Sequence, residues 1–250
     1  SVSGAQLDGE RRAFMRFTNM CGSFLLLLPC TIAMAAETHN QLTAREQAAG
    51  WQLLFDGESL EHWRTYRKPA PDLEWQAVDG EIKLTRRGGG DLITRDTWAS
   101  FELTLNWKIS EGGNSGIFFL AGESSRPIFF LAPEIQILDD ARHRDNKLAS
   151  HRSGSLYDMI AAPPESQKPA GEWNSVVISH LNGHLQVWQN DVQTVDIQIG
   201  GERWNALLAE SKFADWEGFG SLTSGHFGLQ DHGDVVSFRN LKVRTITEMP

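Results

Sequence analysis

Apolar and polar residues alternate along much of the chain after position 50. The clearest case runs from Phe101 to Ile109, where the odd positions are apolar and the even positions are polar. A period of two is typical of a strand with one buried face. We therefore expect the odd positions of this run to face a core and the even positions to face outwards.

Short turns connect further predicted strands. Asn182-Gly183 and Asp79-Gly80 are strong hairpin signals because their residues accept a positive φ. The first predicted pair is 173–181 with 184–188, and a third strand, 192–199, follows the turn at Asn190-Asp191. The second pair is 75–78 with 81–84. The third is 227–230 with 235–243, joined by Asp231-His232-Gly233-Asp234. Many antiparallel strands joined by short turns predict an all-β sandwich or barrel.

One helix is predicted, over Glu202 to Phe213. Its support is the helical spacing of Trp204, Leu207, Leu208 and Ser211. No internal repeat is present. The fold expected from the pattern is therefore all-β with one short helix.

Residues 1–36 have the pattern of a targeting segment. Met15 or Met20 can serve as the natural start, which makes 1–14 an upstream extension. An apolar stretch begins at Phe24 and is too short to span a bilayer, which needs ~20 apolar residues. Ala33-Met34-Ala35 then offers a small-x-small cleavage pattern. We expect export to the periplasm or the exterior, with no membrane span; the alternative is a buried N-terminal helix.

Leu27-Leu28-Pro29-Cys30 also resembles a lipoprotein signal. Pro29 stands where such signals favour Gly or Ala, so simple secretion is preferred over lipidation. Residues 37–50 are polar and rich in Ala and Gln, and we interpret them as a linker or a short helix. The folded domain is expected over 51–247.

Composition narrows the choice of partners. The chain has 250 residues, of which 40% are hydrophobic and 22% charged, with a formal net charge of −9. These proportions exclude a disordered or collagen-like chain. The acidic balance argues against nucleic acid, because phosphate binding needs clustered Lys and Arg. Cys21 and Cys30 are the only cysteines, so the domain itself has no disulfide or thiolate metal site.

The segment from Glu134 to Asp139 is the first candidate site. Alternation places Glu134 and Gln136 on one face of a strand and Ile135 and Ile137 on the core face. A carboxylate and an amide on the open face of a sheet suit sugar binding, and the carboxylate can act as an acid or base. The alternative is an ordinary solvated sheet face.

Residues 139–172 interrupt the strand pattern. Loops longer than about 12–15 residues are usually functional or disordered, and the apolar content of 156–160 favours an ordered binding loop. Its chemistry-bearing residues are Asp139, Asp140, His143, Asp145, His151, Tyr157 and Asp158. His and carboxylate together can bind a metal or relay protons, so a divalent cation stays open as a cofactor. The alternative is a set of surface charges.

Two turns add polar groups. Gly112-Gly113 frees the backbone before Asn114 and Ser115 at the start of a strand, although an ordinary turn explains this motif equally well. Gln230 and His232 lie in a turn between strands, where they can reach a concave face. Asp and Gly are also simple turn formers.

These residues, taken in order, resemble the bacterial 3-keto-disaccharide hydrolase family. The matching motifs are Trp51-Gln52-Leu53-Leu54-Phe55-Asp56-Gly57 with Trp63, Val78-Asp79-Gly80, Phe101-Glu102-Leu103, Gly112-Gly113-Asn114-Ser115-Gly116-Ile117, Glu134-Ile135-Gln136-Ile137-Leu138-Asp139, Gly154-Ser155-Leu156-Tyr157-Asp158, Gly171-Glu172-Trp173-Asn174, Leu181-Asn182-Gly183, Leu229-Gln230-Asp231-His232-Gly233 and Phe238-Arg239-Asn240. The likeness runs from about Trp51 to Thr245. Phe118-Phe119-Leu120 departs from the pattern, because an Arg is expected there.

The resemblance implies a concanavalin A-like jelly-roll sandwich of two antiparallel sheets with a sugar groove. It also implies an exported hydrolase that cleaves the glycosidic bonds of 3-keto-glycosides or 3-keto-disaccharides. Elimination of the C1 substituent followed by hydration is the alternative route on the same substrates. We expect Glu134 as the catalytic carboxylate, with Asp139 or His232 as its partner. The expected substrate-binding residues are Asn114, Gln136, His143, His151, Tyr157, Asp158 and Gln230.

Two non-catalytic classes compete with the enzyme. A carbohydrate-binding domain predicts an exposed Trp platform and scattered carboxylates. A laminin-G-like adhesion domain predicts a flat patch or a calcium site at the rim. The enzyme predicts that Glu134, His232 and Tyr157 meet around one cavity.

Overall fold

The structure is a computed structural model that describes residues 38–125 and 127–248. Residues 1–36, which carry the expected targeting segment, lie outside the described part. The expected linker contains a helix, α1 (Ala44–Ala48), whose start is fixed by reciprocal hydrogen bonds between Thr43 and Glu46. No helix in the described ranges is long and apolar enough to cross a membrane.

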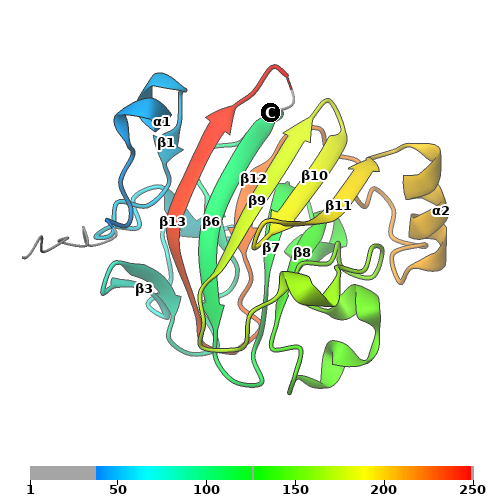
Figure 1. Ribbon diagram of the computed structural model, residues 1–250, viewed down its shortest axis with the longest axis horizontal. Helices are drawn as coiled ribbons and strands as arrows, with labels where there is room; N and C mark the ends of the chain where they lie inside the picture. The colour runs from blue at the N-terminus through cyan, green and yellow to red at the C-terminus, as the bar shows by residue number, and fades with distance from the viewer. Residues whose placement is uncertain (1–37, 126, 249–250) are drawn as a thin grey trace, which may run out of the picture. The chain divides into compact units, whose positions relative to one another are not determined.

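Two antiparallel sheets form the domain, as the alternation predicts, and Figure 1 shows one in front of the other. The eight-stranded sheet has the order β11 (Val192–Gln198), β10 (His184–Gln189), β9 (Asn174–Leu181), β6 (Phe101–Ile109), β13 (Val236–Thr245), β4 (Glu81–Leu84) and β3 (Trp75–Val78), with β1 (Gln52–Leu53) paired to β13. The five-stranded sheet has the order β2 (Trp63–Thr65), β5 (Leu92–Thr94), β12 (His226–Leu229), β7 (Asn114–Ala121) and β8 (Glu134–Leu138). The jelly-roll class is thereby confirmed.

The main core fills the space between the sheets. Strand β6 alternates perfectly between buried and half-buried residues, which confirms the predicted strand. Phe101 of β6 packs edge-on against Phe227 of β12, with ring centroids 4.7 Å apart. The two sheets are thus joined by apolar side chains that the period of two directs inwards.

One predicted hairpin is wrong. β12 pairs with β5 and β7 in the five-stranded sheet, whereas β13 pairs with β4 and β6 in the other. The turn at 231–234 therefore crosses from one sheet to the other. Local turn chemistry predicts a bend, but it cannot say which sheet each flanking strand joins.

The predicted helix is shorter than expected. α2 (Glu202–Glu210) ends because Ser211 adopts an extended conformation with ψ 169°. The next backbone N–H, that of Lys212, donates to the carboxylate of Asp158 at 2.7 Å. This contact with a distant loop ends the helix earlier than the periodicity predicts, so Lys212 lies outside the helix.

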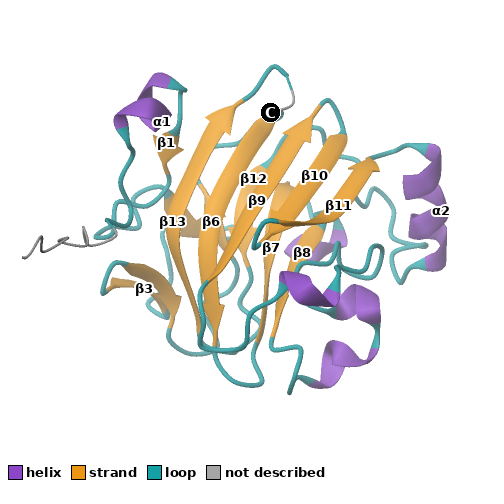
Figure 2. Cartoon of the chain, in the orientation of Figure 1, coloured by secondary structure: helices purple, strands orange, loops and turns teal. Residues whose placement is uncertain are grey.

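Residues 139–172 form an ordered layer beside β8. They contain the helical turns η2 (Arg144–Lys147), η3 (Ala149–His151) and η4 (Pro164–Ser166). Backbone bonds tie the layer to β8: Gln136 N–H donates to Ser155, and Tyr157 N–H donates to Glu134, both at 3.0 Å. Figure 2 shows these turns and α2 on the β8–β11 side of the sandwich. This layer protects the edge of β8 from other strands.

A smaller apolar cluster covers part of the outer face of the five-stranded sheet. It joins Phe118 and Ile93 of the sheet to Ile128, which belongs to the helical turn η1 (Ile128–Phe130). The outer face is therefore covered on one side by η1 and on the other by the loop 139–172. A pocket lies on this face.

Candidate functional site

The pocket has a volume of about 170 Å³ and lies against β8 and the first residue of β7. Its walls come from five separate segments of the chain. The lining residues are Asn114, Phe129, Ala132, Glu134, Gln136, Asp145, Tyr157, Lys212, Phe213, Gln230 and His232. Glu134, Tyr157 and His232 thus meet around one cavity, which is the arrangement that the enzyme interpretation predicts.

Glu134 lies on the outer face of β8 and is only 9% exposed. Its carboxyl lies directly over Gly116 of β7: a Cβ added there would come within 2.0 Å of Oε1. Glycine at this position therefore creates the space that the carboxyl occupies. The expectation of a solvated sheet face is not met, because η1 and the loop cover the strand.

Burial raises the pKa of Glu134 to about 8, and the negative charges of Asp91 and Asp145 act in the same direction. Lys212 and a hydrogen bond from Gln230 oppose the rise without cancelling it. A carboxyl without an ion-pair partner in a desolvated pocket favours its neutral form. Glu134 is therefore largely protonated at neutral pH and can deliver a proton.

Two amide oxygens of the pocket have no hydrogen-bond partner among the described residues. They are Oδ1 of Asn114 and Oε1 of Gln230, and both atoms are buried. Buried acceptors in native proteins nearly always find a donor. Sugar hydroxyls are donors of the right kind, so these oxygens are candidate acceptors for a polyhydroxylated ligand once a small side-chain movement exposes them.

Tyr157 belongs to a hydrogen-bonded group on the opposite wall. Its hydroxyl donates to Asp145 Oδ2 at 2.9 Å. His151 places Nδ1 2.9 Å from Asp145 and Nε2 2.6 Å from Asp158. Burial and the Asp145 contact raise the pKa of Tyr157 above its ordinary value. Tyr157 is therefore a neutral hydroxyl held in one orientation.

Lys212 completes that wall. Its ammonium lies 4.1 Å from the centroid of the Tyr157 ring. Burial lowers the pKa of Lys212, while Glu134, Asp158 and Asp145 oppose the change. Lys212 is the cation of this pocket, and it is suitably placed to stabilise negative charge that develops on a ligand.

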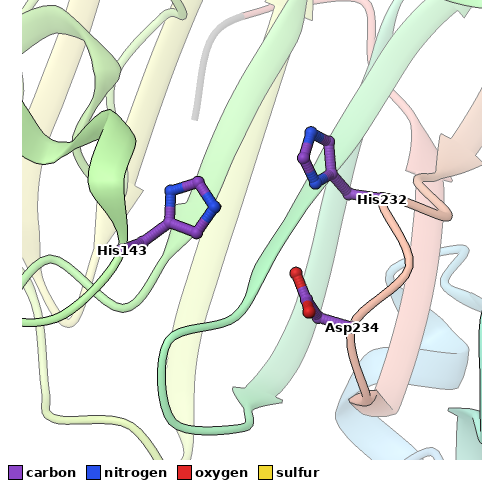
Figure 3. Close-up of side chains that lie close together, drawn as sticks. All are labelled: His143, His232 and Asp234. Carbon is purple, nitrogen blue, oxygen red and sulfur yellow. The ribbon is translucent and has the colours of Figure 1, made fainter.

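His232 stands beside His143 and Asp234, and Figure 3 shows the three side chains directed toward a shared space. His232 and Asp234 come from the turn between β12 and β13, and His143 comes from the loop 139–172. Burial lowers the pKa of His232, with Asp234 opposing the shift. His232 is therefore a neutral imidazole at pH 7, which is the form that accepts a proton.

The same three residues form the one candidate metal group found in the described ranges, with ligand atoms within 4.8 Å of one another. His143 Nδ1 already accepts the N–H of Asp145 at 3.1 Å. In the neutral ring this leaves the proton on Nε2, the nitrogen that would otherwise bind a metal. Asp234 Oδ2 accepts the N–H of Asn114 at 3.0 Å. Asp234 keeps lone pairs for a ligand, but His143 can bind a divalent cation through Nε2 only after that proton moves. No step of the proposed reaction therefore depends on a cation.

Four residues expected at the site do not line the pocket. Asp139 is buried, and its oxygens accept the N–H groups of Gly112 and Ala141 at 2.7 and 3.1 Å. It therefore ties two loops together, and the geometry gives it no contact with the pocket. His143, His151 and Asp158 stand behind the lining residues, where they hold Asp145, Tyr157 and Lys212 in place.

Four lining residues carry no signal in the sequence: Lys212, Phe129, Ala132 and Phe213. Phe213 and Lys212 were placed within or at the end of a predicted helix, and η1 carries no motif that marks it as part of a site. Asp91 was also missed; burial raises its pKa to about 7. Asp91 does not line the pocket, but its negative charge acts on Glu134. No local pattern distinguishes these residues, because their relation to the site depends on distant contacts.

Comparison with known proteins shows which family the chain belongs to. The model of the 3-keto-alpha-glucoside-1,2-lyase-like domain family matches residues 50–244. The chain belongs to this family. It is also 37% identical over 245 residues to the 3-keto-disaccharide hydrolase of Bacteroides thetaiotaomicron, covering 86% of this chain and 84% of the relative.

Solved structures from Parabacteroides distasonis have the same fold. One protein, provisionally named a glycosyl hydrolase, superimposes with a TM-score of 0.78 at 28% identity, covering 84% of this chain and 100% of its own. A second protein of the same description has a TM-score of 0.64 at 26% identity, covering 78% of this chain and 99% of its own. The family resemblance inferred from the ordered motifs is therefore confirmed.

Proposed function

We propose that this protein is a hydrolase that cleaves the glycosidic bond of 3-keto-glycosides. The observation that carries the proposal is the protonated, desolvated carboxyl of Glu134 in a pocket with unpaired amide oxygens. The name of the relative from Bacteroides thetaiotaomicron supports the same substrate class. Carbohydrate is accordingly the proposed partner.

The leaving group needs an acid, and Glu134 is the group in the pocket with a carboxyl proton at pH 7. When the C1–O bond breaks, Glu134 donates this proton to the departing oxygen. General acid catalysis of this kind contributes about 10²–10⁴-fold to the rate. The ionised Glu134 then lies near Lys212, whose positive charge favours the anion.

The route favoured by the geometry begins with elimination. The 3-keto group acidifies the hydrogen at C2, and His232 is the neutral base that takes it. The electron pair forms the C2–C3 enolate and then expels the C1 substituent, with Lys212 and the pocket amides near the developing charge. Water next adds its hydroxyl to C1 and gives its other proton to the ionised Glu134, and the proton on His232 returns to C2. The sum is hydrolysis, with both side chains restored except for proton exchange with solvent.

Direct displacement is less well supported by the site. It requires a second, ionised carboxylate on the opposite side of the sugar. Asp145 is the other carboxylate of the pocket, and although burial acts to raise its pKa, hydrogen bonds from His151 and Tyr157 bring it below the ordinary value. Those same bonds occupy its oxygens. A water would therefore have to compete with two existing contacts.

The test is to incubate the wild-type protein with a 3-keto-α-glucoside and with the matched, non-oxidised glucoside, and to follow release of the aglycone. We expect release from the keto substrate alone. In D₂O, elimination and hydration introduce deuterium at C2 when the proton held by His232 exchanges with solvent before it is returned, whereas displacement leaves C2 unchanged. Binding of the keto sugar without release would reject the hydrolase and leave a carbohydrate-binding domain.

A parallel arm with a chelator examines the group around His143. One outcome is that the chelator abolishes wild-type activity and added divalent cation restores it, whereas the cation does not restore activity in His143→Ala. This outcome would assign a cation to His143, His232 and Asp234. Activity that survives the chelator assigns these residues to proton transfer and hydrogen bonding instead.

Export also belongs to this proposal. The apolar stretch after Arg16 and the Ala33-Met34-Ala35 pattern support secretion to the periplasm or the exterior. Expression of the chain with a C-terminal tag, followed by fractionation and N-terminal sequencing, tests it. A tagged protein that stays in the cytoplasm with an uncleaved N-terminus would contradict it.

A further inference from the structure

Three aromatic rings form a continuous surface at the rim of the pocket. Phe130 stacks on Trp216 with centroids 4.4 Å apart, and Phe129 lies 5.9 Å from Trp216. We call Phe129, Phe130 and Trp216 the aromatic rim. Phe129 also lines the pocket itself, so the rim begins where the sugar site ends.

The folding of η1 explains why two of these rings face solvent. Ile128 is fully buried against the outer face of the five-stranded sheet. In a tight helical turn with about three residues per turn, the next two side chains must point elsewhere. Phe129 and Phe130 are accordingly 37% and 39% exposed. Adjacent exposed aromatic rings form the kind of contiguous apolar surface that marks an interaction site.

The rim is held rigidly from behind. Trp216 packs edge-on against Phe213 at 5.0 Å, and Phe213 stacks on Phe219 at 4.0 Å. The backbone N–H of Gly220 donates to the carbonyl of Leu131 at 2.9 Å, which joins the two segments that carry the rings. A preformed apolar surface loses little conformational entropy when a ligand binds to it.

The size of the pocket decides what reaches this surface. The cavity, of about 170 Å³, is open on one side and has room for one hexose ring. With the keto sugar beside Glu134, the group attached through the departing oxygen has to leave the pocket. Phe129 and Phe213 line the pocket, so an aromatic path leads from its interior to the rim.

We propose that the aromatic rim is an aglycone subsite that selects planar, apolar aglycones such as aryl groups. The side chains of Phe129 and Phe130 present apolar ring surface without hydrogen-bonding groups, on which an aryl ring can stack. The Lys212 ammonium lies 6.0 Å from the Trp216 ring centroid. This inference rests on the proposed function, because it assigns the sugar ring to the pocket.

The test compares 4-nitrophenyl and methyl 3-keto-α-glucosides with the wild type, Phe130→Ala and the double variant Phe129→Ala/Phe130→Ala. Aryl groups are intrinsically better leaving groups, but this advantage is the same in every variant and cancels. We expect the ratio of kcat/KM for the aryl over the methyl substrate to fall about tenfold in the double variant, through KM and not kcat. Leu73→Ala, at an exposed apolar residue on another surface, should keep the wild-type ratio.

Equal losses on both substrates, or an unchanged ratio, would overturn the subsite. A second readout separates this result from failure of the hydrolase itself. Binding of both glycosides to Glu134→Gln is measured by calorimetry, with and without the two Phe substitutions. A preference for the aryl ligand that disappears with the rings supports the subsite even if no turnover is found. Equal affinity for both ligands overturns it, and thermal melting shows whether each variant is folded.

Discussion

The outer faces of the two sheets carry acidic residues in very different settings. On the eight-stranded sheet, Glu81 bonds to Lys108 at 3.0 Å, and Glu102 bonds to Arg244. Burial acts to raise the pKa of Glu81, but hydrogen bonds from Ser237 and Lys108 outweigh it and bring the pKa below its usual value. On the five-stranded sheet, Glu134 has no such partner, and its pKa rises to about 8.

The difference comes from what covers each sheet and not from the strands. β6 and β8 both alternate in sequence, yet every second residue of β6 is half-buried, whereas all of β8 is buried. The 139–172 loop and η1 remove water from β8 alone. Paired carboxylates near solvent add little to stability, while an unpaired and desolvated carboxyl holds a proton that can be used in catalysis.

Replacing Glu134 with Gln should produce the largest effect. We expect aglycone release from a 3-keto-α-glucoside to fall by about 10³-fold, because the amide keeps the shape but has no proton to donate at the leaving oxygen. Steady-state assays measure the loss, and circular dichroism and thermal melting check that the fold is intact. Near-normal activity in a folded variant would remove Glu134 from the mechanism.

The substitution Gly116→Ala should have the next largest effect on activity. The new methyl would lie 2.0 Å from the present position of Glu134 Oε1, so the carboxyl must move. We expect kcat/KM to fall by about 100-fold, since small displacements of a catalytic group are costly. Adding Glu134→Asp shortens the side chain, so the double variant should regain thermal stability but not activity. Full activity in Gly116→Ala alone would show that the position of the carboxyl is not critical.

The third largest effect should be on the pH dependence of stability, which distinguishes the outer face of the five-stranded sheet from that of the eight-stranded sheet. The pKa of Glu134 is raised in the folded state. The carboxyl therefore contributes its full stabilisation of the fold below the unfolded pKa, and this stabilisation is lost as pH rises through about 8. Glu134→Gln removes this ionisation. Relative to the wild type, the variant should gain of order 4 kcal/mol in unfolding free energy between pH 5 and pH 9. Urea melts at both pH values measure the gain, and a constant difference would contradict the raised pKa.

Glu102→Gln on the other sheet should have the smallest effect. It breaks the ion pair with Arg244 on a surface far from the pocket lining. We expect a loss of about 0 to 1 kcal/mol in stability, reduced further by salt, and unchanged kcat/KM. A catalytic defect in this variant would mean that the eight-stranded sheet also takes part in the reaction.

Much of the architecture follows from local pattern. The alternation in 101–109 and the turns at Asp79-Gly80 and Asn182-Gly183 correspond to β6, β3–β4 and β9–β10. Each of these features depends on neighbouring residues, so the sequence contains its cause. The pairing of 227–230 with 235–243 was wrong because choosing a sheet depends on strands more than 100 residues away.

The candidate site was predictable to a similar extent. Alternation places Glu134 and Gln136 on one face and the ordered motifs add Asn114, Gln230 and His232, all of which line the pocket. Asp139 has the right residue type at a strand end, but backbone N–H groups occupy its oxygens. Lys212 could not be found, because its position depends on the bond between its N–H and Asp158.

The most direct measurement is a titration of the Glu134 carboxyl itself. Carbon-13 NMR of protein labelled at the Glu side-chain carboxyl, compared with the same spectra of Glu134→Gln, isolates the one resonance that disappears. The account predicts that this resonance titrates with a pKa of about 8. A midpoint near the ordinary value of 4.5 would show that water reaches the carboxyl, and it would contradict the claim that the covered face of the five-stranded sheet creates a catalytic acid.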